Sequence, residues 1–103
     1  MSTQYQIVYW RDIPAQIKVR QGGGRVSRQL TARFQEAIDE AAMRGQVTDA
    51  DDYLAEWRSS EWQNSEEDGE KLADTLVAQI EAEYTPERLR DLKINKGYEV
   101  LGE

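Results

Sequence analysis

Hydrophobic and polar positions change their period several times along the 103 residues of the chain. Residues 5–10, YQIVYW, carry β-branched and aromatic side chains on both faces, which predicts a strand that is central or covered on both sides. Residues 15–20, AQIKVR, alternate between apolar and polar side chains, so they predict a second strand. Its inward positions are Ala15, Ile17 and Val19, and its outward positions are Gln16, Lys18 and Arg20. Residues 11–14, RDIP, predict a four-residue turn that joins the two strands as a hairpin.

Apolar positions three and four residues apart predict helices in the rest of the chain. The first helix is expected over residues 28–44, with Ser27 as its N-cap and Gly45 as its stop. The second is expected over residues 66–84, and a short third helix over residues 86–93 begins with a proline.

Two segments leave alternatives open. Residues 53–58 alternate as a strand that could continue through Trp62, but a helix over residues 49–58 fits the same letters. The tail predicts either a short edge strand at residues 98–101 or a segment that packs down on the body. The order of elements predicts a single α+β domain over residues 1–103: two layers, with a small, mostly antiparallel sheet and two main helices on one face.

Composition excludes several kinds of chemistry. The chain has no Cys and no His, so thiol catalysis, His-based nucleophile systems and the usual zinc ligand sets cannot be built from it. The acidic run at residues 49–52 begins like a calcium loop, but Leu54 stands where that loop needs glycine and Ser60 where it needs glutamate. We therefore expect no metal site, no cofactor and no catalytic residue.

The first residues lack a basic segment followed by an apolar core, and no apolar run is long enough to span a bilayer. These features predict a cytoplasmic protein without a membrane partner.

Charge is distributed unevenly. The formal net charge is −7, which argues against nucleic acid as a partner. Residues 1–35 hold six basic residues and one acid, whereas residues 36–103 hold seven basic residues and nineteen acids. A local basic surface on an acidic body follows from this split.

The run GGGRVSR, residues 22–28, is the first candidate site. Glycines before a helix N-terminus expose backbone N–H groups to an anion, and arginines can add bidentate contacts. The candidate anion-binding residues are Lys18, Arg20, Gly22, Gly23, Gly24, Arg25 and Arg28. The alternative is a flexible hinge with solvated arginines.

Aromatic residues beside arginine form the second candidate, a surface that contacts a partner protein. The residues in question are Trp10, Arg11, Trp57, Arg58 and Trp62. The alternative is that these tryptophans fill the small core.

The run YWRDIPAQ, with the IKVR and glycines that follow it, resembles the short bacterial "virulence factor" domain family. The same domain occurs in conserved virulence factor C proteins, where helical repeats accompany it. The resemblance implies no reaction and carries over no catalytic residue. It also implies an association of stand-alone members with gene neighbourhoods for folate and corrinoid one-carbon metabolism.

Three functions are compatible with these features. We expect a non-enzymatic accessory domain that contacts a protein partner. The alternative is a binder of an anionic small ligand, such as phosphate, a nucleotide or a folate-like molecule, at the glycine loop and the start of the first helix. An enzyme that pairs carboxylates with Arg or Lys comes third, because no such pairing is visible in the sequence.

Overall fold

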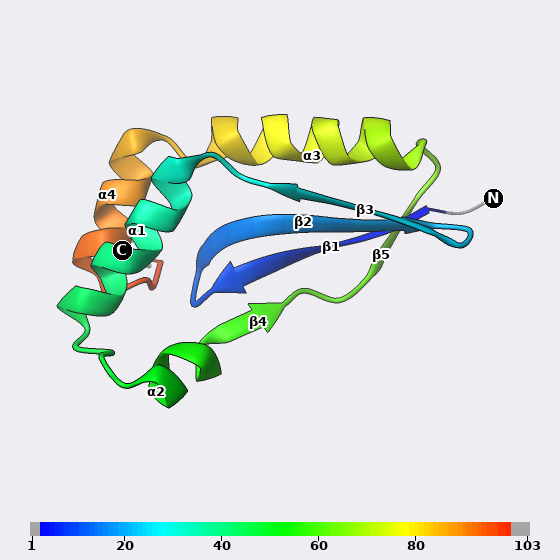
Figure 1. Cartoon of the computed structure of the whole chain (residues 1–103). Helices are drawn as coiled ribbons and strands as arrows, with labels where there is room; N and C mark the ends of the chain where they lie inside the picture. Colours follow the sequence, from blue (N-terminus) through cyan, green and yellow to red (C-terminus); the bar gives the residue numbers. More distant parts are fainter. Residues whose placement is uncertain (1–2, 100–103) are drawn as a thin grey trace.

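The computed structural model describes residues 3–99, in which five antiparallel strands form one sheet and four helices pack against it (Figure 1). The strands are β1 (Thr3–Trp10), β2 (Ile13–Gln21), β3 (Gly24–Gln29), β4 (Trp57–Ser59) and β5 (Gln63–Ser65). The helices are α1 (Ala32–Arg44), α2 (Ala50–Ala55), α3 (Gly69–Glu83) and α4 (Pro86–Ile94). The predicted α+β class is confirmed.

The sheet has the order β3-β2-β1-β4, and β5 pairs with the other end of β1 along the same edge. Strand β1 is therefore central, as its sequence predicted. The strand β4 pairs with Val8–Trp10 and β5 with Thr3–Tyr5, so two short pieces together complete one edge of the sheet.

Helix α3 lies along one side of β2 and β3, while α1 and α4 pack together at the end of the sheet where β1 ends and β2 begins (Figure 1). The apolar stripes of these helices meet the sheet in one core, because each buries the face that its periodicity predicted. The largest fully buried apolar side chains are Trp10, Ile13, Ile17, Phe34, Ile38 and Leu92. Within residues 3–99, no helix is long and apolar enough to cross a membrane.

The turn between β1 and β2 is tighter than predicted. Trp10 pairs with Ile13, so the connection consists of Arg11 and Asp12 rather than of residues 11–14. Arg11 adopts a φ of 54°, and its backbone N–H donates to the Glu56 carbonyl at 3.1 Å. Bonds from distant segments thus fix a conformation that local turn preferences did not indicate.

The prediction that the glycines lead into a helix at residue 28 was wrong. Gly22, with a φ of 57°, turns the chain back, and β3 then pairs with β2 along its whole length. Helix α1 begins only at Ala32, and its N-cap is Thr31 rather than Ser27. Residues 24–29 carry a single apolar side chain between glycine and polar residues, so the sequence pattern for a strand was weak.

Both alternatives for the next segment hold in part. Residues 50–55 form helix α2, residues 57–59 form strand β4, and Trp62 lies beyond the end of that strand. In the tail, Tyr98 and Glu99 form no strand, and the remainder of the predicted strand at residues 98–101 lies outside the described residues. The start of α4 is confirmed, because the Thr85 hydroxyl accepts a hydrogen bond from the Arg88 N–H at 3.1 Å and Pro86 follows it.

Candidate functional site

The two sides of the sheet carry different side chains. Residues directly opposite one another on paired strands share a side of the sheet. Ile17 and Val19 of β2 lie on the side under α3, as does Val26 of β3, which pairs with Val19. The neighbouring Lys18 and Arg20 alternate with them, so they lie on the other side.

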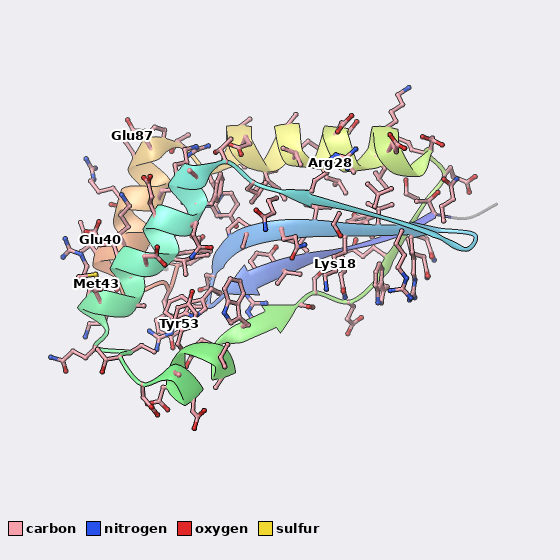
Figure 2. All side chains as sticks on the ribbon, viewed as in Figure 1. Lys18, Arg28, Glu40, Met43, Tyr53 and Glu87 are labelled. Atoms are coloured by element: carbon pink, nitrogen blue, oxygen red, sulfur yellow. The ribbon has the colours of Figure 1, made fainter. Side chains whose placement is uncertain are left out.

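We call this other side of the sheet the open face. Figure 1 shows no helix over the part formed by β2 and β3, and Figure 2 shows Lys18 on the side of β2 away from α3. The pairing places three rows of polar side chains on it. The polar and charged residues of the open face on these strands are Gln4, Gln6, Gln16, Lys18, Arg20, Arg25, Ser27, Gln29 and Asn64. Val8, which pairs with Gln16, and Ser59, which pairs with Val8, lie on the same side.

Three predicted anion-binding residues come together on the open face. Arg20 pairs directly with Arg25, and Lys18 is two residues away along the same strand. Arg20 is held in place, since its Nε donates to the Gln4 side chain at 2.8 Å. Its guanidinium also stacks on the ring of Trp62, with 3.9 Å between Cζ and the ring centroid.

Arg28 does not join this group. It pairs with Ile17 on the side under α3, where its Nε lies 3.3 Å from an Asp74 carboxylate oxygen (Figure 2). A second helix residue, Glu70, lies 3.9 Å from the same guanidinium. Arg28 therefore ties β3 to the acidic outer surface of α3.

The glycines lie at the tip of the β2–β3 hairpin and not at a helix N-terminus. A hollow of about 300 Å³ beside Gly24 reaches the start of α3. The first N–H of that helix, from Gly69, already donates to the Gln21 side chain at 3.0 Å. Arg25 lines the hollow as well, but Asp68 and Glu70 give it a net negative charge, which disfavours an anion there. The predicted anion site at a helix entrance is therefore wrong in its geometry.

Two predicted partner contacts are internal. Trp10 has no exposed surface, and its indole Nε1 donates to the Tyr53 carbonyl at 3.0 Å. The Arg11 side chain is 12% exposed and stacks between the rings of Trp10 and Tyr98. Its Nη1 donates to the Lys96 carbonyl at 2.8 Å. The alternative of core packing is confirmed for Trp10, and Arg11 holds the turn to the C-terminal segment.

The remaining predicted contacts divide between the two ends of the β4 segment. Trp57 is half-buried and packs edge-on against Tyr53, with ring centroids 6.1 Å apart. Trp62 is also half-buried and carries Arg20 on its ring face. Arg58 is 53% exposed and pairs with Asp12 at 3.0 Å. Trp62 therefore borders the open face through its contact with Arg20, and Trp57 lines a hollow of about 100 Å³ together with Gln16 and Gln29 of that face.

Several residues that the structure places in the candidate sites were not predicted from the sequence. Gln4 and Gln6 of β1 lie on the open face, and the alternation of side chains along that strand could have predicted this. Asn64 of β5 also lies there, but alternation in its short segment could not have predicted it.

On the other side of the sheet, four residues line a hollow of about 310 Å³: Tyr9, Arg58, Tyr84 and Arg88. Burial raises the pKa of Tyr84 to about 12, and burial also raises the pKa of Tyr9 despite the nearby Arg58.

The Glu81 carboxylate of α3 is held by hydrogen bonds at the start of α1. Burial alone would raise the pKa of Glu81, but hydrogen bonds from Thr31 and the nearby Arg33 guanidinium outweigh it and lower that pKa. The Thr31 N–H donates to Glu81 at 2.8 Å and thus satisfies an N–H group that its helix leaves without a partner. Among residues 3–99, no cluster of three or more acidic side chains is placed to hold a metal ion.

The fold and this surface define a small α+β domain with one helix-covered and one polar side of its sheet. Residues 8–92 match the model of the virulence factor family, and the chain belongs to that family. The YWRDIPAQ run, residues 9–16, comprises the end of β1, the turn and the start of β2, and it supplies Trp10 and Ile13 to the core. No curated protein and no solved structure matches the chain.

Proposed function

We propose that the protein is a non-enzymatic accessory domain that binds an acidic surface of a partner protein through the open face. The single observation that carries this proposal is a group of basic side chains on the open face without acidic partners. Within residues 3–99, Lys18, Arg20 and Arg25 have no carboxylate within ion-pair distance. In the same part of the chain, Lys71, Arg90 and Lys96 have none either, but they lie on separate segments, whereas Lys18, Arg20 and Arg25 lie together on one side of the sheet. The other six arginines each have a carboxylate within this distance: Arg11, Arg28, Arg33, Arg44, Arg58 and Arg88.

Charge complementarity supports an acidic partner. The chain has a net charge of −7, so the open face is a basic island on an acidic molecule. Such an island attracts acidic surfaces of other proteins. A nucleic acid would meet repulsion from the rest of the surface.

The composition of the face supports a protein partner. Glutamine, serine and asparagine side chains offer both hydrogen-bond donors and acceptors, which suits a protein surface of mixed polarity. Trp62 adds an aromatic residue whose position is fixed by Arg20, and a pre-positioned aromatic residue loses little entropy on binding.

Site-specific photo-crosslinking tests the proposal in native cells. A photoreactive amino acid replaces Lys18 on the open face in one variant and Lys71, which is exposed on α3, in a matched control. We expect a crosslinked product of defined mass from position 18 that is absent from position 71. The double substitution Arg20→Glu/Arg25→Glu, made in the position-18 variant, should abolish that product.

Charge reversal elsewhere is the control for the loss of charge. Lys71→Glu/Arg90→Glu makes the same change in net charge at exposed positions of α3 and α4, and it should leave the product from position 18 intact. Equal crosslinking from positions 18 and 71, or equal loss with both double substitutions, would contradict the proposal.

A further inference from the structure

A hollow of about 310 Å³ lies between the end of β1 and the end of α3, away from the open face. Tyr9 comes from β1, Arg58 from β4, Tyr84 from the end of α3 and Arg88 from α4. Segments that are distant in the sequence converge here, so the hollow is a product of the tertiary fold. Its volume is at the small end of the range for ligand pockets, which spans about 300–1,000 Å³.

Both guanidinium groups in the hollow are held in fixed positions. Arg58 lies over the Tyr9 ring at 4.6 Å and donates to the Asp12 carboxylate at 3.0 Å. Arg88 lies over the Tyr84 ring at 3.9 Å, and its Nη2 donates to a Glu99 carboxylate oxygen at 3.0 Å. Such stacking and pairing remove most of the freedom that a long side chain would lose on binding a ligand.

Several hydrogen-bond donors in the hollow remain unused. Within residues 3–99, the Nη1 of Arg58 and the hydroxyls of Tyr9 and Tyr84 have no hydrogen-bond partner. A phenol with the ordinary pKa of 10.0 is already protonated at neutral pH, and burial raises the pKa of both tyrosines further, so each hydroxyl can donate. Three unused donors on a hollow of this size match a ligand that presents acceptor atoms.

We propose that this hollow binds a small organic monocarboxylate. Asp12 and Glu99 already neutralise the two guanidinium groups, so the four charged groups that line the hollow sum to zero. A bound monocarboxylate adds one negative charge to this neutral site, whereas a phosphate dianion adds two and meets more repulsion. A carboxylate has two acceptor oxygens, which can take hydrogen bonds from Arg58 and from the phenols at once.

Glu99 makes the proposal specific. Its carboxylate occupies the fork of Arg88 from inside the chain, and its negative charge repels a ligand carboxylate in the hollow. Glu99→Gln keeps the shape of this side chain but removes its charge. The substitution should therefore strengthen the binding of an added carboxylate rather than weaken it.

Titration followed by NMR tests the proposal with benzoate as the probe. We expect saturable shifts of the Ser60 and Glu99 amide signals, with a Kd of about 1–10 mM, the range expected for a small fragment. Neutral benzamide and inorganic phosphate should each bind at least about tenfold more weakly. No saturation with benzoate up to about 100 mM, or equal shifts with benzamide, would overturn the proposal.

Two variants separate ligand contact from a structural role. Tyr84→Phe removes one donor and should weaken benzoate binding by about fivefold, the usual effect of one hydrogen bond. Glu99→Gln should tighten binding, while Glu87→Gln on the exposed surface of α4 should leave it unchanged. The Trp10 indole signal verifies that each variant is folded. If folded Tyr84→Phe and Glu99→Gln both bind as the wild type does, the proposal is wrong.

Discussion

The side of the sheet under α3 and the open face are built from the same strands, yet their charged residues behave differently. Arg28, on the side under α3, pairs with Asp74 and Glu70 of the helix. Arg25, three residues earlier and on the open face, has no acidic partner among the described residues. The need to hold the fold together explains the first arrangement. It does not explain the second, which is why we assign the open face to a partner.

The largest expected effect comes from comparing alanine substitutions of two adjacent residues of β2 that lie on opposite sides of the sheet. Ile17 is fully buried under the helices, so Ile17→Ala should lower the free energy of unfolding by about 2–5 kcal/mol. Lys18→Ala, one residue along and exposed on the open face, should change it by less than about 0.5 kcal/mol. Urea denaturation measures both. Similar losses in the two variants would show that the open face is part of the folded core.

The two ends of β2 offer a second contrast. Gly97 packs on the Arg11 turn with a φ of +95°, and a Cβ there would lie 3.0 Å from Cζ3 of Trp10. Gly97→Ala should therefore lower stability by about 1–3 kcal/mol. Gly23 lies at the other end, at the tip of the β2–β3 turn, with nothing within 4 Å of a Cβ. Gly23→Ala should be neutral within about 0.5 kcal/mol in the same urea experiment, and an equal loss would contradict this contrast.

The covered side should also respond to alkaline pH. Burial raises the pKa of Tyr84 to about 12 in the folded protein, above its unfolded value of 10.0. The stability that depends on the neutral phenol is therefore complete below pH 10 and is lost as pH rises through 12. We expect unfolding free energy to fall by about 1–2 kcal/mol over this window in the wild type and by less in Tyr84→Phe. Identical alkaline limbs in the two proteins would rule out this role.

The smallest expected effect compares the two arginines of β3. Arg28→Gln removes a surface ion pair with α3 and should cost about 0.3–1 kcal/mol at low salt, with less effect at high salt. Arg25→Gln should have no measurable effect on stability at either salt concentration. Thermal unfolding at two ionic strengths measures the stability of both variants. The prediction is wrong if Arg25→Gln destabilises the protein as much as Arg28→Gln does.

Local patterns predicted much of this architecture. Alternation in residues 15–20 separated the buried Ile17 and Val19 from the exposed Lys18, and helical periodicity located α1, α3 and α4. These predictions hold because burial of one face dominates the energetics of an amphipathic element.

The errors arose where distant contacts outweigh local preference. The glycines form a hairpin because β3 gains backbone hydrogen bonds along β2, which the polar letters of residues 24–29 do not reveal. Arg11 is buried because the C-terminal segment folds over it, through the Lys96 carbonyl and the Tyr98 ring. No local pattern could place Tyr84 and Arg88 beside Tyr9, since they lie on separate elements. The candidate sites were therefore less predictable than the elements that carry them.

The central claim concerns which side of the sheet a partner covers. The chain has three tryptophans, and their indole Nε1–H signals report different places in the structure. Trp62 contacts Arg20 beside the open face, whereas the indole N–H of Trp10 is bonded inside the core. Titration of the ¹⁵N-labelled protein with the partner identified by crosslinking should shift the Trp62 signal to saturation and leave the Trp10 signal unchanged. A saturated complex in which the Trp62 signal has not moved would contradict the account.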